Sequence, residues 1–178
     1  MAVWFAGCVA LALIAFAVIT FNDLVAARNR VRNAWANIDV QLQRRHDLVP
    51  PLAAVVRGYA DHESSTLQAI ADLRSRAQAG GSVGVRSAIE KELGAGLSRL
   101  LAVQEHYPEL KASANFLDLQ RQLVAVEDAL QSARSAYNEA VQTYNTQIQQ
   151  FPDVLLARPF GFAASEFFQA GSTGAVGL

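Results

Sequence analysis

The chain has 178 residues and a mass of 19.2 kDa, enough for one domain with a hydrophobic core and too little for two once the apolar N-terminus is set aside. Fifteen Lys and Arg balance sixteen Asp and Glu, and the net charge of −1 argues against nucleic acid as a partner. A single cysteine, Cys8, excludes a disulfide framework and a cysteine-based metal site.

Residues 2–21, AVWFAGCVALALIAFAVITF, contain no charged side chain. As a helix, about 20 residues rise roughly 30 Å, which matches the hydrocarbon core of a bilayer. A cleaved signal peptide is the alternative, but the segment lacks a basic start and its apolar run is longer than a signal peptide needs. We therefore expect a transmembrane anchor over residues 1–22.

Three arginines, Arg28, Arg30 and Arg32, follow the anchor at alternate positions, and no basic residue precedes it. Positive residues beside a span tend to stay on the cytoplasmic side, so we expect an outside N-terminus and a cytoplasmic body, with a periplasmic or external body as the alternative. The arginines either lie on a solvated helix exit or contact anionic lipid headgroups.

Residues 28–63 repeat apolar side chains every seven positions, a spacing that predicts an amphipathic helix in need of partner helices. Pro50 and Pro51 interrupt the repeat without shifting its phase, which fits a kinked but continuous helix. Proline inside a helix is costly, however, and Asp47 could instead cap a new helix, so three or four bundle helices stay possible. The two apolar rows are Val31, Ile38, Leu52 and Tyr59, and Trp35, Leu42, Val49 and Val56.

Two further helices are expected downstream. Ser87-Ala88-Ile89-Glu90 has the spacing of a capping box and opens a helix that ends near His106, since Pro108 disfavours helix at the preceding residue. The last helix begins at residues 115–118 and extends for about 37 residues, or roughly 55 Å. Its clearest row is Phe116, Leu123, Leu130, Tyr137, Tyr144 and Phe151. We therefore predict an all-α fold, a long antiparallel up-and-down bundle over residues 23–152 with coiled-coil-like packing.

Polar residues interrupt the last helix at a seven-residue spacing, as Tyr137-Asn138 and Tyr144-Asn145. Tyrosine can bury its ring while its hydroxyl finds a partner, and asparagine beside a seam can fix register. These residues, with Trp35, are expected either in ordinary core packing or in a polar ladder between subunits.

Residues 153–178 change character, because aromatic side chains gather here. Phenylalanines stand at positions 160, 162, 167 and 168, and their rings need cover. We expect Phe160, Phe162, Phe167 and Phe168 to strap across the end of the bundle; the alternatives are insertion at the membrane surface and docking on a neighbouring subunit. The last eight residues, GSTGAVGL, are expected to be disordered.

Nothing in the sequence points to catalysis or to a metal. The histidines, His46, His62 and His106, form no pair at helical spacing, and polar contacts at helix ends explain them better. The carboxylates of Glu90 and Glu92 splay apart on a helix, as do those of Glu127 and Asp128, which is typical of solvated faces. We expect no cofactor and no small-molecule substrate.

Three ordered blocks of this sequence resemble the LemA family of bacterial membrane-anchored proteins, which includes magnetosome membrane proteins. The first block runs from RNRVRNAWANIDVQLQRRHDLVPPL through GYADHE, and the others are LLAVQEHYPELKASANFLDLQRQL and ARSAYNEAVQTYNTQIQQFP. The family usually has Leu-Ile-Pro-Asn-Leu where this chain has Leu48-Val49-Pro50-Pro51-Leu52. The resemblance implies a helical bundle behind one span of the bacterial cytoplasmic membrane, and no known catalytic activity.

The expected function is therefore that of a non-enzymatic scaffold. It would self-associate as a homo-oligomer through its long helices, with the lipid bilayer as partner, and organise or shape the membrane. The alternative is an adaptor that binds a membrane protease or another envelope-stress protein.

Overall fold

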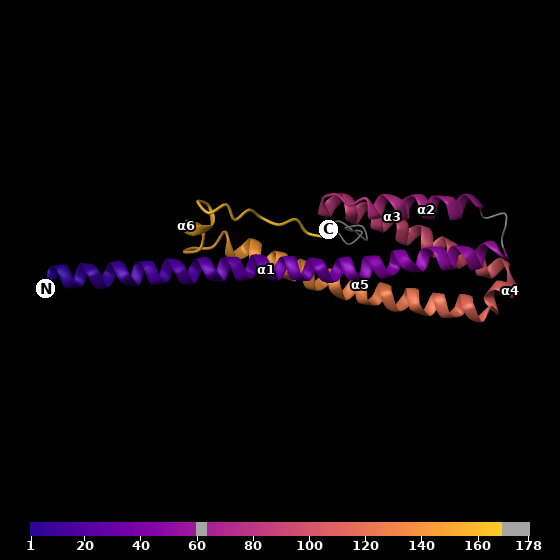
Figure 1. The fold of residues 1–178 in the computed structure, drawn as a ribbon, viewed down its shortest axis with the longest axis horizontal. Helices are drawn as coiled ribbons and strands as arrows, with labels where there is room; N and C mark the ends of the chain where they lie inside the picture. The colour runs from indigo at the N-terminus through magenta and orange to yellow at the C-terminus, as the bar shows by residue number, and fades with distance from the viewer. Residues whose placement is uncertain (60–63, 169–178) are drawn as a thin grey trace, which may run out of the picture. The chain divides into compact units, whose positions relative to one another are not determined.

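The protein is described by a computed structural model that covers residues 1–59 and 64–168 (Figure 1). All regular elements in these residues are helical, as expected. They are α1 (Ala2–Arg57), α2 (Ser64–Gln78), α3 (Val83–Ala102), the 3-10 helix η2 (Val103–His106), α4 (Pro108–Lys111), α5 (Ala114–Gln147) and α6 (Val154–Ala157). His62 and the C-terminal segment expected to be disordered lie outside the described residues.

The chain divides into two compact units. Unit 1 contains residues 1–36 and 136–166, and the described part of unit 2 contains residues 37–59, 64–135, 167 and 168. Helices α1 and α5 contribute to both units. The domain boundaries expected from the sequence, after residues 22 and 152, stay predictions.

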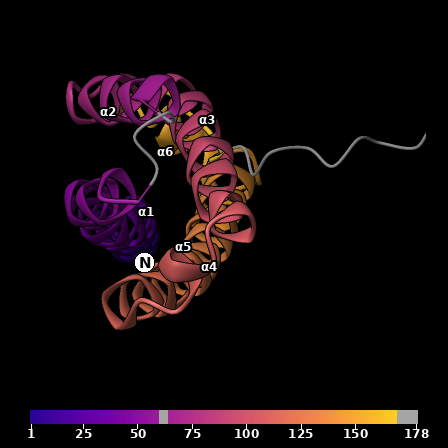
Figure 2. The same ribbon diagram turned by 90° about the vertical axis from the view of Figure 1, so that its right-hand side faces the viewer.

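Unit 2 is built on an apolar core that four helices share. Helices α2 and α3 lie side by side (Figures 1 and 2), and a Cβ on Gly96 of α3 would lie only 3.2 Å from the Ile70 side chain of α2. Burying each large apolar side chain contributes about 1.5–3 kcal/mol, so the seven-residue rows supply much of the driving force. The core includes Val49, Leu52 and Val56 of α1, Leu67 and Ile70 of α2, Leu93, Leu97 and Leu100 of α3, and Phe116 and Leu123 of α5.

Helix α1 continues through Pro50 and Pro51 to Arg57, the continuous helix among the alternatives left open by the sequence. Pro50 has no backbone N–H, so the carbonyl oxygen of His46, four residues earlier, loses its helical donor. Arg74 of α2 replaces that donor, because its Nε donates to the His46 oxygen at 2.8 Å. A neighbouring helix thus compensates part of the cost of proline in α1.

Two expected helix boundaries are wrong. Helix α3 begins at Val83 with Ser82 as its N-cap, whose hydroxyl accepts from the Val85 N–H at 3.4 Å. Ser87 and Glu90 are buried inside α3, so they form no capping box. Helix α5 ends at Gln147, and Phe151 beyond it is 80% exposed rather than part of the apolar row.

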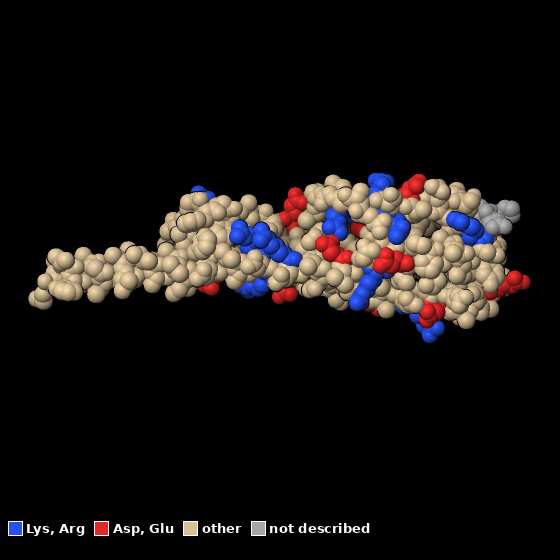
Figure 3. Space-filling model, viewed as in Figure 1, with Lys and Arg blue, Asp and Glu red and all other residues tan. Residues whose placement is uncertain are grey.

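Unit 1 joins the start of α1 to the end of α5. Leu24, Ala27 and Val31 of α1 are buried, as are Tyr137, Val141, Tyr144 and Ile148 on the α5 side. The apolar stretch of α1 before this contact is exposed, and it is long and apolar enough to cross a membrane. Figure 3 shows no charged side chain on its visible face.

Candidate membrane-facing site

The C-terminal segment of unit 1 packs on α1 where the apolar stretch ends. The Phe21 ring meets Phe160 and Phe162 edge to face, with centroid distances of 5.1 and 5.7 Å. Phe162 is buried, and the Arg28 guanidinium lies 4.8 Å from the centroid of its ring. One cation and three aromatic rings therefore gather at the exit of the expected anchor.

Hydrogen bonds hold the extended segment after Phe162 on α5. The Tyr137 hydroxyl donates to the carbonyl of Glu166 at 2.8 Å, and the Tyr144 hydroxyl donates to that of Ala163 at 3.0 Å. The Asn145 amide donates to the Ser165 carbonyl at 2.9 Å and accepts from its N–H at 2.8 Å. Polar side chains of the seven-residue seam thus bind the tail of their own chain, which supports the strap interpretation.

The hydroxyls of Tyr137 and Tyr144 stay protonated and can donate to the tail. Burial raises the pKa of Tyr137, and the negative charge of Glu166 raises it further. Burial also raises the pKa of Tyr144, and the positive charges of Arg28 and Arg32 offset only part of this rise. Both hydroxyls therefore keep their protons, and with them the contacts to the tail, at neutral pH.

The remaining packing residues divide between the two units. In unit 1, the Trp35 and Tyr137 rings meet edge to face at 5.3 Å, and Asn138 is half-buried beside them on α5. In unit 2, Phe168 is buried under the Arg134 guanidinium, which lies 5.0 Å from its ring centroid, whereas Phe167 is exposed.

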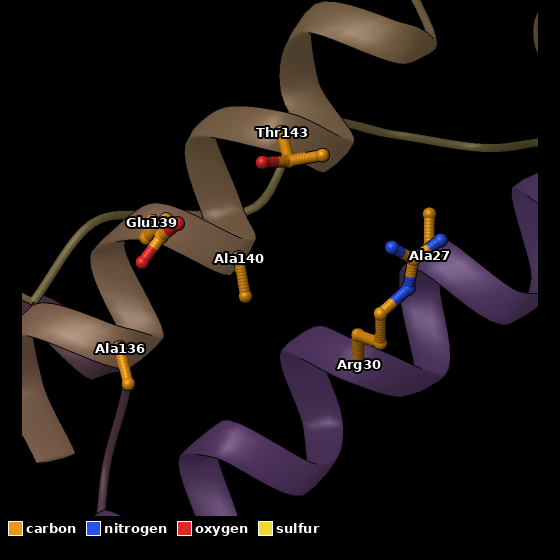
Figure 4. Close-up of a pocket in the computed structure, with 6 residues that line it drawn as sticks. All are labelled: Ala27, Arg30, Ala136, Glu139, Ala140 and Thr143. Carbon is orange, nitrogen blue, oxygen red and sulfur yellow. The ribbon is translucent and has the colours of Figure 1, made fainter.

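The juxtamembrane arginines differ in environment. Arg28 is half-buried, whereas Arg30 and Arg32 are exposed. Arg30 lines a shallow pocket of about 190 Å³ between α1 and α5 in unit 1 (Figure 4). The other lining residues are Ala27, Ala136, Glu139, Ala140 and Thr143. The pocket thus offers one arginine, one carboxylate and one hydroxyl among alanines. Lipid contact by the three arginines stays a prediction.

Unit 2 contains a buried ionic network that the sequence interpretation missed. The Arg45 guanidinium contacts the Glu90 carboxylate, donates to the Glu90 carbonyl at 3.0 Å and reaches the Glu127 carboxylate at 2.8 Å. His46 Nε2 lies 2.8 Å from the other Glu90 carboxylate oxygen. Arg45 and Glu90 are each only 1% exposed. Glu90 therefore lies on no solvated face, and His46 lies inside α1 rather than at its end.

The charges of this network stabilise one another. Burial alone would raise the pKa of Glu90, but the hydrogen bond with His46 and the charge of Arg45 outweigh burial, so the pKa lies below its ordinary value. Burial and the charge of Arg45 lower the pKa of Arg134. Glu90 is closed to solvent, and Arg45 and His46 occupy both of its carboxylate oxygens. The carboxylate therefore joins α1 to α3 and is not placed to exchange protons with a substrate.

A signal for the network was present in the sequence. Arg45 stands midway between Ile38 and Leu52, at the one position of their seven-residue row that is not apolar. A charged residue on an apolar seam needs a buried partner. Periodicity alone could not identify that partner as Glu90.

Comparison with known proteins covers most of the chain. Residues 34–176 match the model of the LemA family. The chain belongs to the LemA family. The resemblance carried by the three sequence blocks is thereby confirmed.

Proteins similar to this chain include magnetosome proteins and a protein named LemA. Magnetosome protein MamQ 2 of Paramagnetospirillum magneticum is 28% identical over 189 residues, covering 92% of this chain and 70% of the relative. Magnetosome protein MamQ of Magnetospirillum gryphiswaldense is 28% identical over 193 residues, covering 92% and 71%. Protein LemA of Metamycoplasma hominis is 27% identical over 154 residues, covering 84% and 68%.

Proposed function

We propose that this LemA-family protein is a non-enzymatic scaffold, anchored by one membrane span, that self-associates and organises or shapes the membrane. The observation that carries the proposal is the continuity of α1. Helix α1 runs from the apolar stretch at Ala2 to Arg57 and supplies Val49, Leu52 and Val56 to the core of unit 2. Relatives named as magnetosome proteins support association with a membrane.

The same proposal includes the long antiparallel bundle. The core that α1, α2, α3 and α5 share supports it, because up-and-down helices joined by short loops bury such seams against their neighbours. Helices of 56 and 34 residues, α1 and α5, also offer extended surfaces along which copies could align. Exposed apolar side chains stand on these surfaces at Val40, Leu117 and Val124.

The topology belongs to the proposal as well. The N-terminus lies outside and the body lies in the cytoplasm of a bacterial cell, with the span in the cytoplasmic membrane. Arg28, Arg30 and Arg32 support this orientation, because basic residues beside a span favour the cytoplasmic side. A periplasmic body is the alternative. Protease added to intact spheroplasts would cleave a periplasmic body and would leave a cytoplasmic body intact.

Crosslinking in native membranes tests the scaffold directly. Two copies with different tags are co-expressed, and a photo-crosslinking amino acid is placed at Val40 or Val124. We expect crosslinks that join the two tags, and none in a control where separately expressed copies are mixed after solubilisation. A stoichiometric foreign partner in place of self-crosslinks would contradict the scaffold and favour an adaptor.

A further inference from the structure

The chain around α6 exposes large apolar side chains. In a stretch of ten residues of unit 1, Phe151 is 80% exposed, Leu155 is 63% exposed and Phe160 is 60% exposed. Three large exposed apolar side chains in one short segment are unusual on a protein surface that faces water. We call residues 151–161 the α6 hairpin.

The α6 hairpin lies against the apolar stretch of α1. Figure 1 shows α6 alongside α1, and an apolar groove of about 340 Å³ separates their side chains. The groove is lined by Ile14, Ala17, Val18 and Phe21 of α1, with Leu156 and Phe160 of the hairpin. Leu156 thus shares a groove with Ile14, a residue that lies about 10 Å deeper along the helix than Phe21.

The depth of the anchor therefore fixes the depth of the hairpin. When residues 2–21 cross the hydrocarbon core, the turns from Ile14 to Phe21 lie within one leaflet. The hairpin that packs beside these turns then lies in the same leaflet. The geometry points to the α6 hairpin as a wedge that inserts among the lipid acyl chains beside the anchor, an inference that rests on the membrane anchor of the proposed function.

Most of the hairpin backbone is internally paired. From Val154 to Phe162 each backbone N–H donates to a backbone carbonyl, with the Val154 and Ala157 bonds at 2.8 Å, and Pro159 has no N–H to satisfy. An unpaired backbone group is costly in hydrocarbon, so this pairing lowers the cost of insertion. Arg158 is exposed at the hairpin and is long enough to reach the headgroups.

Both ends of the hairpin return to the same side of the bilayer. The chain enters from the end of α5 and leaves along α5, where the Tyr144 hydroxyl holds Ala163 at 3.0 Å. The wedge therefore adds volume to one leaflet only. This asymmetry gives each anchored copy a direct means of bending the bilayer.

Spin-label accessibility in vesicles tests the wedge on the full-length protein. Cys8→Ser removes the native thiol, and single cysteines are placed at Leu155 or Phe160, at Ile14 in the anchor, and at Val85 on α3 as an exposed apolar control. The labelled proteins are reconstituted in vesicles of phosphatidylcholine and phosphatidylglycerol. Relaxation by oxygen, which partitions into lipid, is compared with relaxation by a water-soluble nickel chelate.

The expected oxygen-to-nickel ratio at positions 155 and 160 is several-fold higher than at position 85 and approaches that at position 14. Ratios at 155 and 160 equal to that at 85, with position 14 immersed, would overturn the wedge and leave the anchor intact. A low ratio at position 14 as well would overturn the anchor and the wedge together. Circular dichroism equal to that of the unlabelled protein verifies that each variant is folded.

Discussion

A single arginine on the apolar seam of α1 sets the chemistry of the core in unit 2. Arg45 is fully buried, and Glu90, Glu127 and their neighbours compensate its charge. Removing one partner of a buried ion pair leaves the other charge uncompensated, which costs more than replacing both partners by apolar residues.

Glu90→Gln should therefore destabilise the protein strongly. We expect a loss of about 3 kcal/mol in the free energy of unfolding, near the lower end for a broken buried pair because Glu127 still contacts Arg45. The double variant Arg45→Met/Glu90→Leu should recover much of that loss. Urea unfolding followed by circular dichroism measures both, and a double variant less stable than Glu90→Gln would refute the coupling.

The lowered pKa of Glu90 predicts a stability that depends on acid pH. The group binds a proton more weakly in the folded state, so its stabilisation is complete above the ordinary value of 4.5 and is lost as the pH falls through the lower folded value. Unfolding free energies measured from pH 6 downward should fall for the native chain. In Glu90→Gln this part of the decrease should be missing.

Arg74 is expected to matter because of Pro50. Arg74→Met leaves the carbonyl oxygen of His46 without its donor and should cost about 1–3 kcal/mol. The control Arg76→Met removes an arginine of the same helix whose side chain is 60% exposed and pairs with Glu92 at 3.8 Å, so its effect should stay below about 0.5 kcal/mol.

A double-mutant cycle separates the two roles of Arg74. In Pro50→Ala the N–H returns to the helix, and Arg74→Met should then cost less than it does beside proline. An equal cost in both backgrounds would show that Arg74 stabilises the fold without replacing the missing helical bond.

At the scale of elements, the strap depends on tyrosine hydroxyls. Tyr144→Phe keeps the ring but removes the donor to Ala163, and should cost about 1 kcal/mol. Hydrogen exchange of the peptide that contains residues 162–168 should become faster, because local opening becomes easier. Tyr59→Phe, at an exposed ring, is the control, and unchanged exchange in Tyr144→Phe would contradict the role of the hydroxyl.

The seven-residue spacing sufficed to predict the long helices α1 and α5 and much of the seam, since Val31, Ile38, Leu42 and Leu52 are all buried, but it did not separate α2 from the helix before it. The start of α3 was harder to predict, because Ser82 and Ser87 could both serve as the N-cap. Only the tertiary packing distinguishes them. Phe151 kept the spacing but lies past the end of α5, because a repeat alone does not mark where a helix stops.

The candidate site was predictable in part. Composition and spacing predicted a strap for the C-terminal phenylalanines, with membrane insertion or subunit docking as alternatives, and a packing or register role for Tyr137 and Tyr144; these assignments stay predictions. The contacts of these tyrosines with the tail did not follow, because they join segments 29 and 19 residues apart through backbone carbonyls that no sequence pattern marks. The Arg45–Glu90 pair joins residues that are 45 positions apart in the sequence, and it was not predicted for the same reason.

At the scale of the whole molecule, the proposed function depends on what many copies do together. One span displaces little lipid, whereas aligned copies with long helices can impose spacing on a membrane. An apolar groove beside the proposed anchor and an ion pair, Arg45–Glu90, that is closed to solvent both favour structural work over catalysis.

The most direct test of this account is the particle mass of the purified full-length protein in detergent and in lipid nanodiscs, measured across a concentration series. The account predicts an oligomer with a fixed number of copies that persists on dilution. Particles containing one copy at every concentration would contradict it.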